Sequence, residues 1–253
     1  MESRSIVRTG ASTGAPVADI RRPAYAIDVM GGFEVRRDTG VLDLPISTRR
    51  LVALLALNRG CHTRTRVGAI LHGERDEARA LANLRMTLFR VRQFAPALID
   101  SSTNGLRLDP AVRVDLDQLA ALAKALDDGS LTEPSGVDPE QFCRELLPGW
   151  YDDFVDIHRE IVRQMCLHAL ENLARALLRQ RHVAQALHVA LTAVSQSPLR
   201  ETSHQLVIEI HLAEGNVGEA RRQFETLTRL LWSELRVRPS DAVRMTLVSR
   251  GVL

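Results

Sequence analysis

Three arginines and no carboxylate occur within residues 81–94, whose sequence is LANLRMTLFRVRQF. Apolar residues recur in this segment at steps of three, four and three, which predicts a helix with one buried face formed by Leu81, Leu84, Leu88 and Val91. The polar side chains expected to point away from that face are Asn83, Arg85, Thr87, Arg90 and Arg92. Guanidinium groups form paired hydrogen bonds with phosphate and guanine. The segment therefore predicts a surface that binds a polyanion.

Charge is distributed unevenly along the chain of 253 residues, although its formal net charge is only +2. Residues 34–108 contain 13 arginines and 7 carboxylates, whereas residues 109–253 contain 16 basic and 21 acidic side chains. Such asymmetry indicates a basic module for a polyanion, joined to an acidic module with a different role. The length is sufficient for two domains, each with its own core.

The elements that would position the arginine helix begin with residues 26–45. Their short apolar alternations are interrupted by glycines, which predicts a small antiparallel sheet. Two helices are expected to follow, one with Ser47 as its N-cap and one with Thr63 as its N-cap. In the second of these helices, Ile70 is expected on the inner face.

Residues 98–110 follow the arginine helix and predict two short strands around an Asn104-Gly105 turn. Strands, three helices and a hairpin in this order predict a winged helix-turn-helix domain. We assign this domain to residues 24–110 and expect a disordered leader at residues 1–23.

Residues 111–253 carry helical patterns only. Residues 182–198 and 216–231 align at an offset of 34 residues, which places Ala186 over Ala220. This offset is the tetratricopeptide period, although two ordinary amphipathic helices in a bundle are an open alternative. The predicted fold class is mainly α with a small β component, a winged helix-turn-helix domain followed by an all-α tetratricopeptide-like bundle.

Side chains that could perform catalysis or bind a metal are scattered. His204 and His211 are two helical turns apart, without a carboxylate or cysteine at metal-ligand spacing. The cysteines Cys61, Cys143 and Cys166 fit small buried residues with reduced thiols. We expect no enzyme activity, no catalytic residues, no metal and no cofactor. No apolar run approaches the roughly 20 residues that span a bilayer, so we expect no membrane contact and a cytoplasmic, nucleoid-associated protein.

Six short segments between Phe33 and Ala242 can be compared with known families. They are STRRLVALLALNRG, LRMTLFRVRQF, LPGWYDDFV, HRE, SPLRETSHQLVIEIHLAEGN and WSELRVRPS. Together they resemble the Streptomyces antibiotic regulatory proteins, transcriptional activators that join an OmpR-type winged helix to a bacterial transcriptional activation domain. Two positions depart from that family, because His72 replaces its usual tryptophan and Leu106 replaces its usual tyrosine.

The resemblance implies that residues 80–94 form the recognition helix that enters the major groove of double-stranded DNA. Arg85 and Thr87 are then expected at base edges, together with Asn83. The remaining expected DNA contacts, mainly to phosphates, are Arg90, Arg92, Arg107, Arg49 and Arg50. The resemblance further implies an activator of a biosynthetic gene cluster, as in antibiotic and other secondary metabolism. It would bind direct repeats near the promoter as a head-to-tail homodimer and recruit RNA polymerase holoenzyme.

A second interpretation remains open. The chain could be a helical-repeat protein-interaction adaptor with a winged helix that no longer binds DNA, because tetratricopeptide grooves typically bind peptides or helices. Affinity for random duplex DNA between low and physiological salt distinguishes the two interpretations.

Overall fold

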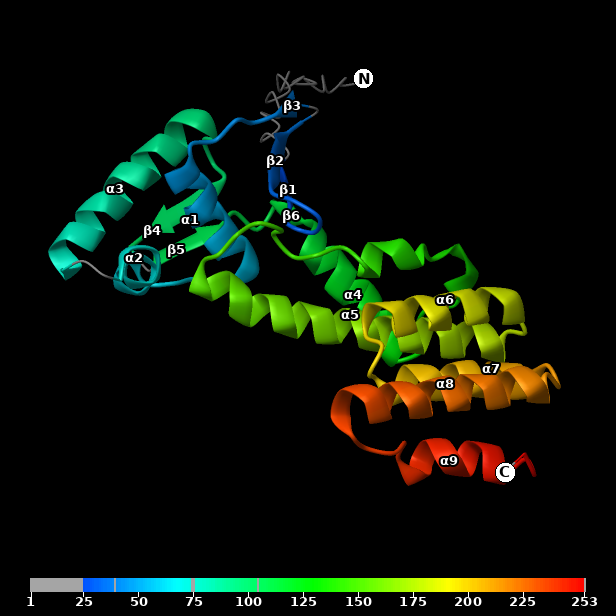
Figure 1. Ribbon diagram of the computed structural model, residues 1–253. Helices are drawn as coiled ribbons and strands as arrows, with labels where there is room; N and C mark the ends of the chain where they lie inside the picture. Colours follow the sequence, from blue (N-terminus) through cyan, green and yellow to red (C-terminus); the bar gives the residue numbers. More distant parts are fainter. Residues whose placement is uncertain (1–24, 39, 74–75, 104, 253) are drawn as a thin grey trace, which may run out of the picture.

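The computed structural model describes residues 25–38, 40–73, 76–103 and 105–252 (Figure 1). The predicted leader, residues 1–23, and Asn104 of the predicted turn lie outside the described residues. The first part of the described chain contains β1 (Tyr25–Asp28), β2 (Glu34–Arg37), β3 (Gly40–Val41), α1 (Ile46–Leu57), α2 (Arg64–His72), α3 (Glu77–Phe94), β4 (Ile99–Ser102), β5 (Gly105–Leu108) and β6 (Arg113–Val114). The second part contains α4 (Asp115–Asp127), the 3₁₀ turns η1 (Pro134–Gly136) and η2 (Pro139–Phe142), α5 (Asp153–Arg179), α6 (Val183–Gln196), α7 (Glu201–Ala213), α8 (Val217–Leu235) and α9 (Asp241–Val248).

The first sheet has the strand order β3-β2-β1-β6. Strands β1, β2 and β3 pair antiparallel, as predicted, whereas β6 pairs parallel to β1. Asp115 follows β6, and its carboxylate accepts the backbone N–H groups of Val29 and Met30 at 2.9 Å each. Burial raises the pKa of this carboxyl, although those hydrogen bonds act in the opposite direction. Asp115 therefore holds the end of β1 against the start of α4.

Helix α1 lies at the centre of the winged helix-turn-helix domain, and every residue from 51 to 57 is buried. A helix that is apolar on all sides belongs inside a core. The prediction of Ser47 as its N-cap is wrong, because α1 begins at Ile46 after Pro45 without a side-chain cap. Thr63 is confirmed as the N-cap of α2, since its Oγ1 accepts the N–H of Arg66. Ile70 is wrongly predicted, because it is exposed on the outer face of α2.

Strands β4 and β5 form the predicted hairpin, with Asp100 opposite Arg107. A backbone bridge joins it to the segment before α2, because His62 and Leu106 exchange N–H···O bonds of 2.9 and 2.8 Å. Gly105 has a φ of +142°, and a Cβ at this position would lie 2.5 Å from the carbonyl oxygen of His62. Glycine therefore permits the close approach that attaches the hairpin.

The second part is all helical and tetratricopeptide-like, as predicted. Helices α6 and α8 begin at Val183 and Val217, which are 34 residues apart. Ala186 and Ala220 are both fully buried where the helices pack. The last helices have a core of their own, formed by Ile208, Ala220, Leu227, Leu231, Val243 and Leu247.

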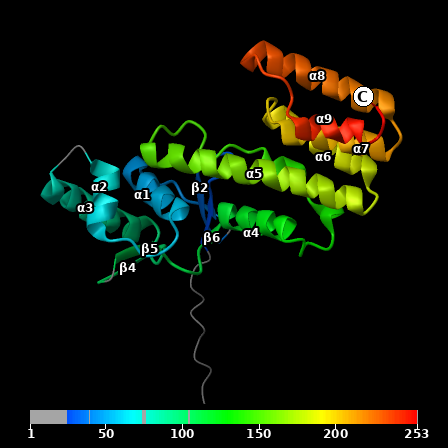
Figure 2. The same cartoon turned by 90° about the horizontal axis from the view of Figure 1, so that it is seen from below.

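Helix α5 extends from the winged helix-turn-helix domain into the helical bundle (Figure 1). Seen from below in Figure 2, its start lies beside α1 and its far end lies beside α6 and α7. In both views α3 lies at one end of the molecule and α8 at the other. Within the described parts of the chain, no helix combines the length and the apolar character that crossing a membrane requires.

Candidate nucleic-acid interface

Helix α3 is positioned by its N-cap and by one apolar face. The carboxylate of Asp76 accepts the N–H of Arg79 at 2.9 Å, which satisfies a free donor of the first turn. The buried face consists of Ala80, Leu84, Thr87, Leu88 and Val91 and packs on α1 and α2. The opposite face looks outward at the edge of the molecule (Figure 1).

The arginines of α3 lie on this outward face, as predicted. Arg85 and Arg92 are exposed, and neither forms a hydrogen bond or ion pair with the part of the chain that the structure describes. Arg90 is also exposed, and its Nη1 donates to Ser47 Oγ at 3.5 Å, at the beginning of α1. Asn83 is half-buried. The positive charge of Arg85 and Arg92 is therefore available to an external anion.

Thr87 does not face outward, so its predicted position is wrong. Only 4% of its surface is exposed, and its hydroxyl donates to the backbone oxygen of Asn83 at 3.0 Å. Threonine commonly forms this bond to the preceding helical turn. Its place in the helix continues the buried row of Leu84, Leu88 and Val91.

Two apolar side chains on the outward face were missing from the set expected from the sequence. Met86 is 55% exposed and Phe89 is 56% exposed. With Ala82 and Gln93 they follow one another at steps of four, three and four residues, which is the spacing of one helical face. We call these four residues the central stripe. A signal was present in the sequence, because Met86 and Phe89 are out of phase with the buried leucines.

The hairpin presents Arg107 next to a carboxylate of its own. Arg107 Nε donates to Asp100 Oδ2 at 2.9 Å across the strand pair, and Arg107 Nη2 lies 2.8 Å from the same oxygen as an ion pair. Arg64 at the start of α2 donates to Ser101 Oγ at 2.9 Å. The expected phosphate contact by Arg107 therefore requires that phosphate compete with Asp100.

The two arginines expected at the start of α1 are also paired. Arg49 donates to Asp43 Oδ1 at 2.8 Å and to the carbonyl oxygen of Leu44 at 2.7 Å. Arg50 Nε donates at 2.8 Å to Asp152 Oδ1, which belongs to the acidic half of the chain. Neither guanidinium is left without a carboxylate, in contrast to Arg85 and Arg92.

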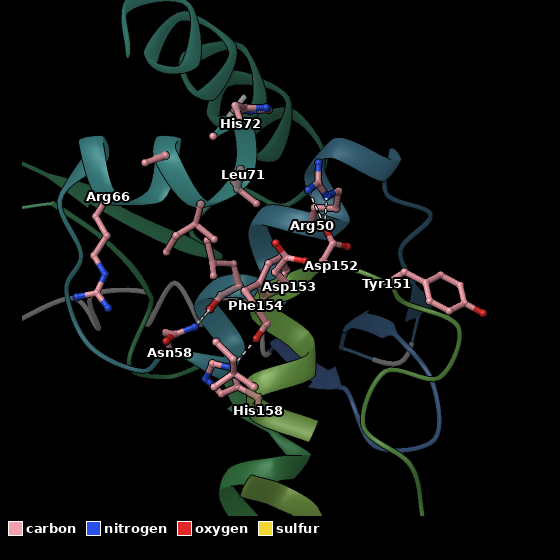
Figure 3. A pocket seen from close by; sticks show the side chains of 15 residues that line it. Arg50, Asn58, Arg66, Leu71, His72, Tyr151, Asp152, Asp153, Phe154 and His158 are labelled. Carbon is pink, nitrogen blue, oxygen red and sulfur yellow. Dashed lines mark hydrogen bonds and ion pairs between the residues drawn. The ribbon is translucent and has the colours of Figure 1, made fainter. Parts of the chain in front are cut away.

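The Arg50–Asp152 pair lies in a groove of about 900 Å³ between α1, α2 and the start of α5. Figure 3 shows the pair at the groove wall, with Phe154 and Leu71 directed into the groove and Tyr151 pointing away. Tyr151 and Ile157 are among the exposed residues that line it. The groove therefore marks the junction between the winged helix-turn-helix domain and the helical part.

The remaining titratable side chains suit packing better than catalysis. Burial lowers the pKa of His204, whose ring nitrogens form hydrogen bonds with the carbonyl oxygen of Pro198 and with Gln223 Nε2. Burial raises the pKa of the Cys166 thiol to about 11. Among the described residues, no group of three or more His, Cys, Asp or Glu side chains could hold a metal ion. Cys61 is exposed, which contradicts its predicted burial.

A known protein family matches most of the helical part of the chain. The model of the family described as bacterial transcriptional activator domain matches residues 140–247. Residues 140–247 therefore resemble a bacterial transcriptional activator domain. This activator domain extends from η2 through α5 to the end of α9 and includes the helix pairs of the repeat.

A solved structure adds information on the fold. The chain is similar to Mycobacterium tuberculosis EmbR in complex with a low-affinity phosphopeptide, with a TM-score of 0.73 and 13% sequence identity. The similarity covers 90% of this chain and 66% of the EmbR chain, so this chain spans about two thirds of that length. At this identity the likeness concerns the fold alone. A comparison with curated proteins finds no match.

Proposed function

We propose that this protein is a sequence-specific DNA-binding transcriptional activator in which α3 enters the major groove. The observation that carries the proposal is the outward face of α3, where Arg85 and Arg92 have no partner among the described residues. The activator domain at residues 140–247 supports a role in transcription rather than in catalysis. A basic helix and an activator domain on one chain suit a protein that connects a DNA site to the transcription machinery.

Within this proposal, Arg85 contacts a base edge and Asn83 supports it. Arg90 and Arg92 contact phosphates, because they lie further along the helix and their guanidinium groups are exposed. Arg107, Arg49 and Arg50 are secondary contacts, since each must exchange a carboxylate for a phosphate. Thr87 has no part in the surface, because it is buried.

The resemblance to the Streptomyces antibiotic regulatory proteins extends the proposal. It adds an OmpR-type winged helix, direct repeats near a promoter as the operator and a head-to-tail homodimer on DNA. It also adds recruitment of RNA polymerase holoenzyme and control of a biosynthetic gene cluster.

The test compares two arginine variants on a DNA duplex selected by the wild-type protein from a random library. Arg85→Ala should weaken binding to that duplex by about 1–3 kcal/mol and relax the base preference at one position. Arg221→Ala is the matched control, because Arg221 is exposed on α8 at the opposite end of the molecule. Equal losses for Arg85→Ala on the selected duplex and on random DNA would refute the assignment.

One observation favours the adaptor as a second candidate function. Three of the expected phosphate contacts, Arg49, Arg50 and Arg107, are already paired with carboxylates of the chain. An adaptor would show almost no affinity for random duplex DNA at low salt. An activator should bind it, and the affinity should fall steeply as salt rises.

A further inference from the structure

We propose that the central stripe of α3 recognises thymine, with Met86 and Phe89 packing on the 5-methyl groups of thymine bases in the major groove. This inference rests on the proposed DNA-binding function and specifies which feature of the DNA the helix recognises. It concerns two side chains whose exposure has no explanation within the chain itself.

The position of the stripe on the helix supports the proposal. At 3.6 residues per turn, Met86 and Phe89 lie at the middle of the outward face, directly opposite the row of Leu84, Leu88 and Val91. Arg85 and Arg92 lie along one edge of the stripe, and Arg90 lies along the other edge. The surface therefore has an apolar centre between two positively charged margins.

A DNA major groove has the complementary arrangement. Its floor carries base edges, among which the thymine methyl is the apolar group, and its walls are rows of phosphates. Arg92 on one margin and Arg90 on the other suit the phosphates of the two walls. Arg85 reaches a base edge beside the apolar centre, which faces the floor. The rise between Met86 and Phe89 along the helix is about 4.5 Å, so the two side chains reach neighbouring or nearly neighbouring base pairs.

Charge also favours DNA over an apolar protein surface as the occupant. The segment from 81 to 94 contains three arginines and no carboxylate. An apolar protein partner would leave these charged margins without counter-charges, whereas phosphates supply counter-charges on both sides.

Replacement of thymine by deoxyuridine tests the contact, because it removes the methyl group and leaves Watson–Crick pairing unchanged. The probe is a duplex selected by the full-length protein from a random library, synthesised with thymine or with deoxyuridine at each thymine position in turn. Loss of one buried methyl corresponds to about fourfold weaker binding. We expect this loss at one or two positions of the selected site.

The variants assign the effect to the stripe. Phe89→Ala should reduce the thymine-to-uracil affinity ratio at one position towards one, and Met86→Ala should do so at a nearby position. Phe89→Leu keeps an apolar contact and should retain most of the ratio. Phe94→Ala is the matched control, because Phe94 is also exposed on α3 but lies off the stripe. Circular dichroism of each variant verifies that the fold is intact.

The outcomes separate this inference from the proposed function. If the wild-type protein binds its selected duplex specifically but tolerates every deoxyuridine, the thymine contact is refuted and the DNA-binding function stands. If no sequence is enriched from the library, both are refuted. If Phe89→Ala changes self-association but leaves the thymine-to-uracil ratio unchanged, the stripe is a protein interface and the inference is refuted.

Discussion

Replacing Asp100 with asparagine should strengthen DNA binding by the hairpin. Asp100 accepts a hydrogen bond from Arg107 and forms an ion pair with it, which compensates the positive charge that the hairpin would otherwise present to phosphate. Asn has nearly the same shape, so the strand pair should remain intact. The variant therefore frees Arg107 without changing the backbone that positions it.

The size of the effect follows from the exposure of the pair. The side chains of Arg107 and Asp100 are 46% and 35% exposed, so the pair is worth about 0.2–1 kcal/mol. Removing this competition should raise the affinity for DNA by up to about fivefold at low salt. If the freed guanidinium neutralises one phosphate, the slope of log affinity against log salt should steepen by about 0.9.

The assay is a titration of a labelled random duplex at several salt concentrations, with the wild-type protein, Asp100→Asn and Arg107→Ala. Glu225→Gln is the control, because it removes one negative charge from an exposed pair on α8, far from α3. The reasoning is refuted if Asp100→Asn leaves the salt slope unchanged. It is also refuted if Glu225→Gln steepens the slope equally, because net charge alone would then explain the gain.

Four further predictions concern α5, the hairpin and α3. Glu171→Ala should lower the free energy of unfolding, measured in urea, by about 3–5 kcal/mol. This buried carboxylate accepts hydrogen bonds from Arg200, Thr202 and Ser203. Glu160→Ala is the control and should lower that free energy much less, because Glu160 belongs to an exposed ion pair of the same helix. Burial raises the pKa of Glu171, but the hydrogen bonds from Arg200, Thr202 and Ser203 lower it below its ordinary value of 4.5. The carboxylate should therefore stabilise the fold above pH 4.5, and this stabilisation should be lost as the pH falls below that value. The free energy of unfolding of Glu171→Gln should depend less on pH below 4.5. Gly105→Ala should destabilise the hairpin by about 1–3 kcal/mol, which faster hydrogen exchange at Leu106 would reveal. Gly40→Ala should not destabilise it, because a Cβ at Gly40 would meet only the backbone oxygen of Arg37 at 3.8 Å, an ordinary contact. Thr87→Val should leave base preference on the selected duplex unchanged, because its hydroxyl is directed at Asn83; a changed preference would contradict the inward placement.

Periodicity along the sequence was sufficient to predict the elements that depend on a single repeated pattern. The buried positions of Leu84, Leu88 and Val91 on α3, the strand pair β4–β5 and the offset of 34 residues between α6 and α8 occur as predicted, whereas Leu81 is only half-buried. Each depends on local spacing, because side chains on one face of a helix or strand must be apolar in order to pack.

Residue type was a weaker guide to where an individual side chain points. Thr87 is polar but occupies a buried position, and its own helix satisfies its hydroxyl. Phe89 is apolar but occupies an exposed position. Trp232 on α8 is apolar and also more than half exposed. In each case helical phase, rather than polarity, determines the direction.

Pairing between distant residues could not be predicted from local patterns. Arg50 and Asp152 are 102 positions apart in the sequence, and they meet only because α5 begins beside α1. The pair of Arg107 and Asp100 depends on the register of β4 against β5, which residue types alone do not determine. Charge counts show that residues 34–108 are net positive. They do not show which arginines of this segment are paired with carboxylates, as Arg49, Arg50 and Arg107 are.

The same pair links the two parts of the molecule mechanically. Asp152 is the N-cap residue of α5, a helix of 27 residues that spans about 40 Å. Because Arg50 holds that end against α1, and α1 packs on α3, the direction of α5 is fixed relative to the outward face of α3. DNA bound to α3 would therefore orient the helices α6 to α9, which follow the far end of α5. Arg50 accordingly serves this orientation better than it serves a phosphate, since its Nε and Nη2 both donate to Asp152.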